Sequence, residues 1–164
     1  MKTLLLIRHA KSDWSNDGLL DIDRPLNNRG YADAYTMSKL FKETKILPDL
    51  IISSSAIRAI STALIISRNL NYNPSAILIN SSLYESTTNK YSKVVEKIDS
   101  GYKCVLLFGH NPVISDFAMN LGHPLKTEMV TCAVATINKE VKNWTQFISA
   151  KTETCDYNFP KHQL

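Results

Sequence analysis

The chain has 164 residues, the size of a single domain, and its 44% hydrophobic and 21% charged residues are typical of a folded globular protein and exclude a disordered chain. The five glycines and six prolines follow no fixed period, which excludes a collagen-like or linker-rich sequence. The formal net charge of +4 comes from scattered basic residues, which suits a small anionic ligand and disfavours a nucleic-acid partner.

The first half of the chain alternates short apolar runs with helical patterns. Apolar runs at residues 2–7 and 50–53 predict two strands. Asn27 or Asn28 can cap a helix after the first strand, and residues 56–70 predict a second helix. The expected buried positions of these helices are Ala34, Met37, Phe41, Ile57, Ile60 and Leu64.

The same alternation continues through the middle of the chain. Residues 76–79 predict a third strand, and a further helical pattern follows that Gly101 closes. The apolar run at 103–108 predicts a central strand covered on both faces. Pro112 stands where another helix would begin, and Gly122 ends it. The expected buried positions here are Tyr91, Val94, Val95, Ile98, Ile114, Phe117, Ala118 and Leu121.

The last part of the chain has two apolar runs with no helical pattern between them. Residues 132–137 and 144–148 therefore predict a hairpin that turns through 138–143. We expect one domain over residues 1–151 and a C-terminal tail over 152–164. The pattern as a whole predicts a three-layer α/β fold, with a mostly parallel central sheet and helices on both faces.

The sequence also predicts a cellular location. The N-terminal apolar run, Leu4–Ile7, stops at Arg8 and is too short for a secretory signal. No apolar run reaches the roughly 20 residues that span a bilayer, so we expect no membrane partner. The three cysteines, Cys104, Cys132 and Cys155, are widely spaced without a CxxC pair, which favours free thiols. We therefore expect a cytoplasmic protein.

Arginine, histidine and glutamate side chains follow the predicted strands where each strand ends. The first strand leads into Arg8 and His9, and the helix after the second strand carries Arg58 in its first turn. Glu85 follows the third strand and His110 follows the fourth. Because ligands of an open α/β sheet bind outside the carboxyl ends of its strands, we expect these side chains to meet at one site.

This combination of side chains suits phosphoryl transfer. The planar guanidinium groups of Arg8 and Arg58 match the oxygens of a phosphoryl group, and the start of the Arg58 helix adds backbone donors. His9 is the candidate nucleophile, because two neighbouring guanidinium groups would lower its pKa and keep it neutral. His110, either neutral or protonated, would stabilise the transferring group, and Glu85 is the candidate proton donor to the leaving group.

Structural roles are the alternatives for single residues of this set. Arg8 could pair with Asp13, His9 could be a hydrogen-bonded histidine at a strand end, and Glu85 could be an exposed carboxylate. Residues 11–13 lie in the loop above the expected site, where serine and aspartate are also ordinary turn formers. The other histidines, expected in a loop and in the tail, are His123 and His162.

A metal site is the competing chemical interpretation, since two histidines and a carboxylate can bind zinc or iron. Two neighbouring arginines disfavour a cation, and the sequence has neither HExxH nor a cysteine pair. The first strand leads into RHAKSDW and not into GxGxxG, which disfavours a dinucleotide. We therefore expect neither a metal nor a cofactor.

Four motifs follow one another along the chain: LLLIRHAKSDW at 4–14, DRPLNNRG at 23–30, IISSSAIRAISTA at 51–63 and FGHNP at 108–112. Together they resemble the histidine phosphatase superfamily, the phosphoglycerate-mutase-like proteins, and most of all its short SixA-like phosphohistidine phosphatases. The resemblance covers nearly the whole chain up to about residue 148. One departure is that the RHG motif of the family reads RHA here.

The resemblance implies that His9 is the phosphorylated nucleophile and that Arg24 reaches the phosphate from the long first loop. It also implies a phosphate pocket completed by Arg8, Arg58 and His110. A salt bridge from Arg24 to Asp21 or Asp23 is the alternative. Some SixA-like members lack an obvious acid, so the role of Glu85 stays open.

The substrate class follows from what the sequence lacks. Five residues separate Glu85 from the helical pattern at Tyr91, which leaves no room for a large cap insertion. An open site favours hydrolysis over phosphate relay, and it would admit phosphohistidine on a protein surface. We expect a phosphatase that forms a covalent intermediate on His9, with a phosphohistidine-carrying protein as substrate and partner. The alternatives are a small-metabolite phosphatase and a non-catalytic phospho-anion-binding module on the same fold.

Overall fold

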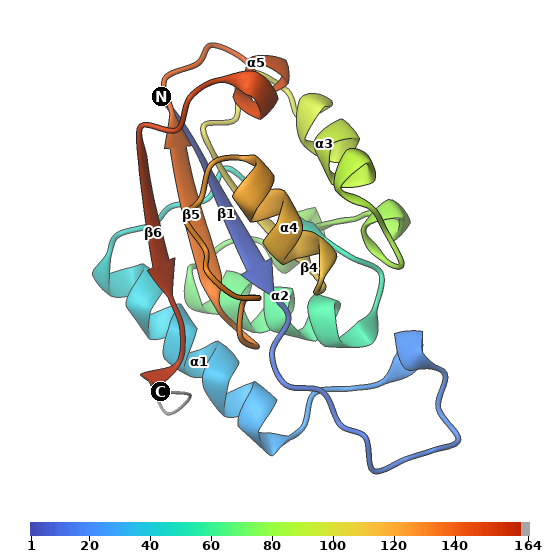
Figure 1. Ribbon diagram of the computed structural model, residues 1–164. Coiled ribbons are helices and arrows are strands. Elements are labelled where there is room, and N and C mark those ends of the chain that lie inside the picture. Colours follow the sequence, from blue (N-terminus) through green and yellow to red (C-terminus); the bar gives the residue numbers. More distant parts are fainter. Residues whose placement is uncertain (162–164) are drawn as a thin grey trace.

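A six-stranded sheet lies at the centre of the computed structural model, which describes residues 1–161 (Figure 1). The strands are β1 (Lys2–Arg8), β2 (Leu50–Ser53), β3 (Leu78–Ile79), β4 (Cys104–Gly109), β5 (Val134–Lys139) and β6 (Thr154–Asn158). Their order across the sheet is β3-β2-β4-β1-β5-β6. The first four strands are parallel, whereas β5 runs antiparallel to β1 and β6 antiparallel to β5. The mostly parallel sheet predicted from the sequence is confirmed.

Helices cover both faces of this sheet (Figure 1). One layer consists of α1 (Asn28–Glu43) and α2 (Ile57–Asn69). The other consists of α3 (Thr88–Glu96), α4 (Val113–Asn120) and α5 (Trp144–Ser149). Short 3-10 turns complete the chain: η1 (Asp21–Asp23), η2 (Pro74–Ala76) and η3 (Ser81–Leu83). The three-layer α/β architecture is thus confirmed.

The core is divided by the sheet into two clusters, and β1 contributes to both. Leu4 and Leu6 pack with residues of α3, α4 and α5, whereas Leu5 and Ile7 pack with residues of α1 and α2. All four side chains are fully buried. Successive strand residues point to opposite faces, so an apolar run without polar breaks is what a strand buried on both faces requires. Residues 105–108 of β4 are buried in the same way, as predicted for a central strand.

The helices confirm some of the predicted buried positions and correct others. Asn27 caps α1 by accepting a hydrogen bond from the backbone N–H of Gly30, as its position predicted. In α2 the predicted apolar stripe is wrong, because Ile57 is 40% exposed. Small residues of α2 face the sheet in its place, among them the fully buried Ala59 and Ala63. Alanines let the helix approach the sheet closely, a preference that a search for large apolar residues overlooks.

The C-terminal part of the chain differs from its prediction. Residues 144–149 form the helix α5, not the second strand of a hairpin, because Asn143 caps its first turn and Trp144 and Phe147 bury one helical face. Residues 154–158 pair with β5 as the edge strand β6, so the expected tail over 152–164 is wrong for this segment. His162, placed in that tail, lies outside the described residues.

Gly109, the last residue of β4, is required by its contact with α3. A Cβ atom at this position would overlap the hydroxyl group of Tyr91, which is fully buried. We expect Gly109→Ala to lower the free energy of unfolding by about 1 to 3 kcal/mol, the usual range for overpacking a core. Urea denaturation would measure this, with Gly109→Ala/Tyr91→Phe as the comparison. An equal loss in both backgrounds would contradict the assigned clash, because phenylalanine removes the nearest atom.

Candidate active site

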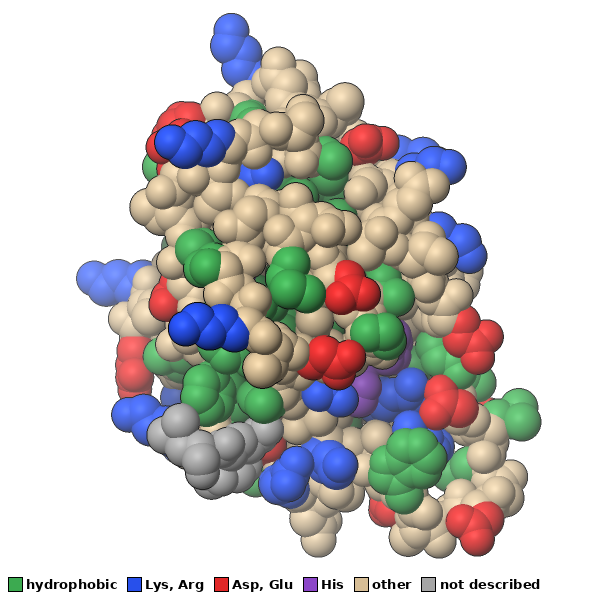
Figure 2. All heavy atoms as spheres, in the orientation of Figure 1, with side chains coloured by type: hydrophobic (Ala, Val, Ile, Leu, Met, Phe, Trp, Pro, Cys, Tyr) green, Lys and Arg blue, Asp and Glu red, His purple; other side chains and the backbone are tan. Residues whose placement is uncertain are grey.

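The register of two parallel strands brings His9 and His110 together. Arg8 of β1 lies beside Gly109 of β4, so the residues that follow each strand leave the sheet side by side. The centroids of the two imidazole rings are 5.0 Å apart, with an interplanar angle of 50°. In Figure 2, histidine side chains lie in a recess among arginine or lysine and carboxylate side chains, near the carboxyl ends of β1 and β4. The predicted meeting of two strand-end histidines is therefore present.

The hydrogen bonds of His9 define the state of its ring. Nδ1 lies 2.7 Å from the carbonyl oxygen of Ala10, which can only accept, so this nitrogen carries the proton. Nε2 then holds a lone pair, toward which the Nε–H of Arg58 donates at 3.3 Å. His9 is buried but retains 8% exposure, so the residue is not fully closed off from solvent.

Burial keeps both imidazoles neutral. It lowers the pKa of His9 from 6.5 to about 3, and the charges of His110, Arg58 and Arg8 add to this effect, while the bond to Ala10 opposes it. Burial and then Arg58 lower the pKa of His110 to about 4. The lowered pKa of His9 agrees with the sequence prediction, although burial and not the arginines is the main cause. Of the two states that the sequence leaves open for His110, the lowered pKa favours the neutral one in the free protein near neutral pH.

These two pKa values predict how stability depends on pH. Between pH 6.5 and about 4 the unfolded chain takes up protons on both histidines while the folded protein does not, so the free energy of unfolding falls as the pH falls. The contribution of the two histidines to the free energy of unfolding is therefore fully present above pH 6.5 and is lost progressively toward acid pH. Urea denaturation at pH 7, 5.5 and 4.5 would measure it. The variant His9→Gln/His110→Gln should lose less free energy of unfolding between pH 7 and 4.5. The same pH dependence in the variant and the wild type would contradict the assignment of this loss to the two histidines.

Asp21 connects the positive side chains of the site. Its carboxylate accepts hydrogen bonds from Arg58 Nη2 at 3.0 Å, from Tyr84 Oη at 2.7 Å, and from Nε and Nη2 of Arg24 at 3.1 and 3.0 Å. Its backbone oxygen accepts from Arg58 Nη1 at 2.7 Å. Partial burial raises the pKa of Asp21, but the hydrogen bonds from Tyr84, Arg58 and Arg24 outweigh it and lower the pKa to about 2. The carboxylate is therefore ionised.

The long first loop is fastened so that Arg24 joins the hydrogen-bond network of Asp21. Ser12 and Leu26 form a β-bridge that closes the loop. Gly30 at the start of α1 packs so close to the backbone of Lys11 that a Cβ atom there would clash. Arg24 itself donates to the hydroxyl group of Ser12 at 2.9 Å and stacks on Trp14 at 3.4 Å. Its salt bridge to Asp21, the alternative from the sequence, is present in this same cluster.

Two buried nitrogen atoms of the site have no partner within the described residues. They are Nε of Arg8 and Nδ1 of His110. Arg8 Nη1 donates to the carbonyl oxygen of Met129 at 2.8 Å, and the alternative pairing with Asp13 is absent among the described contacts. His110 Nε2 lies 2.7 Å from Ser54 Oγ. Buried polar atoms without partners are rare. Here one belongs to the residue before His9 and the other to the ring 5.0 Å from that of His9, and a bound anion could accept a hydrogen bond from an N–H at each.

Glu85 stands apart from this cluster. It shares a pocket of about 250 Å³ with His110, yet among residues 1–161 it makes no hydrogen bond or ion pair. It is exposed, and its φ of +45° places it in the left-handed region.

His123 is the other described histidine outside the cluster. Its Nε2 lies 3.0 Å from the carbonyl oxygen of Asp156 in β6. The loop placement expected for His123 is thus confirmed.

Sequence reasoning missed three residues that shape the site. Asp21 was considered only as a partner of Arg24, and neither Tyr84 nor Ser54 was singled out. The run of serines at 53–55, at the end of a predicted strand, was the available signal for Ser54. Tyr84 had none, since its contact with Asp21 joins residues 63 positions apart.

Residues 1–161 also bear on metal binding, membrane insertion and disulfide formation. This part of the chain contains no group of three or more histidine, cysteine or acidic side chains placed to hold a metal. None of its helices has the length and apolar character needed to span a membrane. Its three cysteines are free thiols, of which Cys132 is buried and Cys155, in β6, is exposed.

Comparisons with known proteins extend these observations. The chain is 28% identical over 153 residues to "Uncharacterized protein At3g52155, chloroplastic" of Arabidopsis thaliana, which covers 87% of this chain and 69% of that protein. It is 41% identical over 64 residues to the 2,3-bisphosphoglycerate-dependent phosphoglycerate mutase of Clavibacter michiganensis subsp. michiganensis (strain NCPPB 382). That match spans 38% of this chain and only 26% of the mutase.

The fold has a counterpart among solved structures. The protein histidine phosphatase SixA complexed with tungstate superposes with a TM-score of 0.81 at 19% identity, covering 99% of both chains. This similarity shows a shared fold.

The sequence pattern of the family described as "Histidine phosphatase superfamily (branch 1)" matches residues 4–103. This is more than half of the chain and includes β1, α1, β2, α2 and α3. The chain therefore belongs to the histidine phosphatase superfamily.

Proposed function

We propose that the protein is a phosphatase that works through a transient phosphohistidine on His9. The observation that carries this proposal is the neutral His9, whose Nε2 lone pair faces Arg58 beside Arg8 and His110. In the first step Nε2 forms a bond to phosphorus, and the leaving group departs with the electrons of its own bond to phosphorus. Water then attacks phosphorus, the P–N bond breaks, and inorganic phosphate leaves His9 in its original state.

The same residues would stabilise the transferring group. The Nε–H of Arg58 donates to His9 in the free protein and is placed to donate to a phosphoryl oxygen once Nε2 is bonded to phosphorus. The Nε–H of Arg8 is buried without a partner and can donate to another oxygen, and so can the Nδ1–H of His110 in the tautomer whose Nε2 accepts from Ser54 Oγ. Arg24 joins them through the network around Asp21. Fixed donors in a partly buried site stabilise developing negative charge more strongly than water does.

For the substrate we propose phosphohistidine on a partner protein. Only two residues separate Glu85 from the start of α3 at Thr88, so this side of the site carries no cap. The name of the SixA structure, a protein histidine phosphatase, supports the same substrate class. A small-metabolite phosphatase is the second candidate, supported by the partial match to a phosphoglycerate mutase. A non-catalytic phospho-anion-binding module is disfavoured, because Arg8, His9, Arg58 and His110 are all in place.

A substrate panel would test this proposal. Rates on a phosphohistidine peptide, an aryl phosphate and common sugar phosphates would be compared in the presence of EDTA. We expect the phosphohistidine peptide to have the highest kcat/KM. Hydrolysis restricted to sugar phosphates would support the metabolite phosphatase, and phosphate binding without any turnover would support the binding module.

Glu85 allows a sharper test of the substrate class. Phosphohistidine expels an imidazole and nitrophenyl phosphate expels a stable phenolate, whereas an alkyl phosphate expels an alkoxide that needs a proton donor. General acid catalysis contributes typically 10² to 10⁴ in rate. Because Glu85 is exposed and forms no hydrogen bond or ion pair within residues 1–161, we expect Glu85→Gln to leave hydrolysis of phosphohistidine peptide nearly unchanged. A hundredfold loss on that peptide would refute this role, while a loss confined to alkyl phosphates would make Glu85 the acid of a broader phosphatase.

We further propose that the protein works in a reducing compartment such as the cytoplasm. Its three cysteines are free thiols. Burial raises the pKa of Cys104 to about 12 and raises that of Cys132 as well, so both thiols stay protonated and unreactive.

A further inference from the structure

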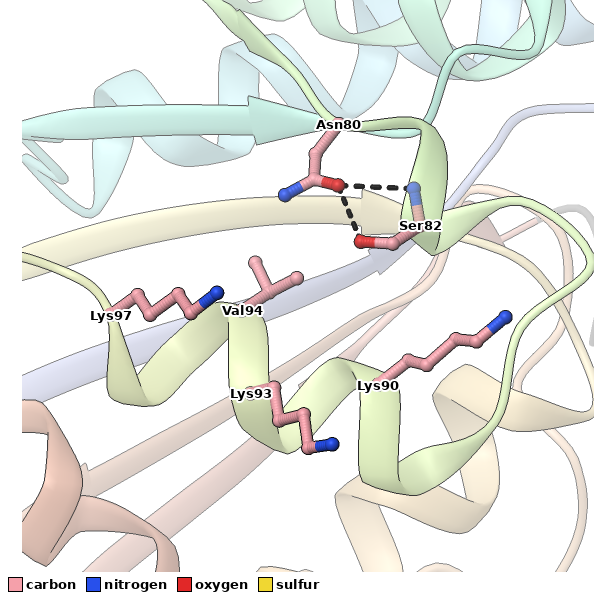
Figure 3. Close-up of a pocket in the computed structure, with 6 residues that line it drawn as sticks. All are labelled: Asn80, Ser82, Lys90, Lys93, Val94 and Lys97. Carbon is pink, nitrogen blue, oxygen red and sulfur yellow. Dashed lines mark hydrogen bonds between the residues drawn. The ribbon is translucent and has the colours of Figure 1, made fainter.

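Two hollows lie next to each other along α3, outside the candidate active site. The first, of about 280 Å³, is lined by Lys90, Lys93, Lys97, Val94, Asn80 and Ser82 (Figure 3). The second, of about 430 Å³, is mainly apolar and includes Leu78, Ile79 and Ile98. Asn80, Val94 and Lys97 line both hollows, which therefore form one continuous surface. We call this surface, defined by the residues just named, the α3 groove.

The basic half of the α3 groove carries positive charge that the protein itself does not neutralise. The spacing of Lys90, Lys93 and Lys97 is i, i+3 and i+7, so the three lysines lie on one side of α3 and its C-terminal cap. At 1.5 Å per residue they extend over about 10 Å. All three are exposed, and within residues 1–161 none forms an ion pair. Figure 3 shows them on successive turns of α3, with Asn80 and Ser82 on the segment across the hollow. Like charges at this spacing repel, and an anionic partner would relieve the repulsion.

The apolar half of the groove exposes side chains that a folded protein normally covers. Leu78 and Ile79 are 55% and 50% exposed, and they form β3, the strand at one edge of the sheet. Edge strands are usually blunted by charge, bulges or a covering segment, because they otherwise attract other chains. Here the charge comes from the lysines of α3 beside them. One carboxylate, Asp99, lines the far end of this hollow.

We propose that the α3 groove docks an acidic and apolar segment of the phosphoprotein substrate, an inference that rests on the proposed phosphatase function. Its apolar side chains would cover Leu78 and Ile79, and its carboxylates would pair with the lysines. The position supports this role, because the segment from Asn80 leads directly through η3 to Tyr84, which contacts Asp21 in the candidate active site. A second copy of this chain is a poorer occupant, since a symmetric contact would bring the same lysines face to face.

Two synthetic substrates would test the docking site. Both carry the same phosphohistidine core, joined by a flexible glycine-serine linker to a segment that alternates leucine with either glutamate or lysine. The variant Lys90→Glu/Lys93→Glu reverses two groove charges. Its matched control, Lys39→Glu/Lys42→Glu, reverses two exposed lysines at the same spacing on α1 and changes the net charge equally. Nitrophenyl phosphate serves as a substrate without a docking segment.

We expect the groove variant to raise KM for the glutamate substrate about tenfold at low salt, with kcat unchanged, as two reversed surface charge pairs would give. The control variant, the lysine substrate and nitrophenyl phosphate should show no such change, and the difference should shrink at high salt. Equal KM values for the glutamate and lysine substrates, or equal effects of the two variants, would overturn the docking site.

A binding measurement separates this inference from the proposed function. If no phosphorylated substrate is hydrolysed, the phosphatase proposal fails. Fluorescence anisotropy with a labelled, unphosphorylated glutamate-leucine peptide still tests the groove, because binding needs no turnover. Binding that is lost in Lys90→Glu/Lys93→Glu would support the groove. Lysine-dependent binding to phosphatidylserine vesicles without peptide binding, or dimerisation through the groove, would overturn it.

Discussion

Replacing His9 with alanine is expected to lower kcat/KM on every phosphorylated substrate by roughly 10⁴ or more, the scale on which enzymes lose activity with their nucleophile. The reason is that no other described nitrogen offers a lone pair at this position. His110 is the only other histidine of the cluster; in the tautomer that lets its Nδ1 donate to a phosphoryl oxygen, Nδ1 carries the proton and Nε2 accepts from Ser54 Oγ. His9→Ala should still fold, because the lost ring makes only one hydrogen bond as a donor, to the neighbouring Ala10.

Rapid quenching with labelled substrate would complete this test. Wild-type protein should yield an acid-labile, base-stable adduct, as expected for phosphohistidine, and His9→Ala should yield none. The variant His123→Gln is the matched control, because it changes the one other described histidine outside the cluster. Full turnover by His9→Ala would refute the covalent mechanism.

Replacing Arg58 with lysine should be nearly as damaging as replacing it with alanine. The guanidinium of Arg58 donates in three directions at once, from Nε to His9 and from Nη1 and Nη2 to Asp21. An ammonium group is a point charge and cannot reproduce this planar arrangement. Each charge-assisted hydrogen bond contributes about 1.5 to 3 kcal/mol. Losing the bond from Nε to the phosphoryl group together with a bond to Asp21 that orients the guanidinium should therefore lower kcat/KM on the order of a hundredfold or more.

The matched control for this change is Arg68→Lys, since Arg68 is exposed in the last turn of the same helix. Steady-state kinetics should leave Arg68→Lys at the wild-type rate. If Arg58→Lys also kept that rate, Arg58 would have a structural role only.

The central strands and the candidate site could be predicted because they depend on short-range patterns and one general rule. Unbroken apolar runs marked β1 and β4, and side chains after parallel strands meet at one edge of a sheet. That rule was enough to bring His9 and His110 together before their register was known. The short β3 was less well placed, because only two of the four residues expected in it, Leu78 and Ile79, pair with β2.

Other features depend on contacts that no local pattern contains. The apolar pattern of 144–148 fits a strand as well as a helix; the burial of Trp144 and Phe147 on one face of α5, together with the Asn143 cap, decides between them. The protonation of His110 depends on its burial in the folded chain. The position of Asp21 depends on the path of the loop between Ser12 and Leu26, which the β-bridge at its base determines.

Asp21 gives the resting enzyme a built-in counter-ion. With a pKa of about 2 it stays negative at any pH where the protein would work, so Arg24 and Arg58 are already paired before a substrate arrives. For a phosphatase, substrate binding is then an exchange of one anion for another, and the net affinity is lower than two bare guanidinium groups would give. The same exchange runs in reverse after hydrolysis. The carboxylate therefore competes for the arginines both with the substrate and with inorganic phosphate, the product common to all substrates, and weakens the binding of both.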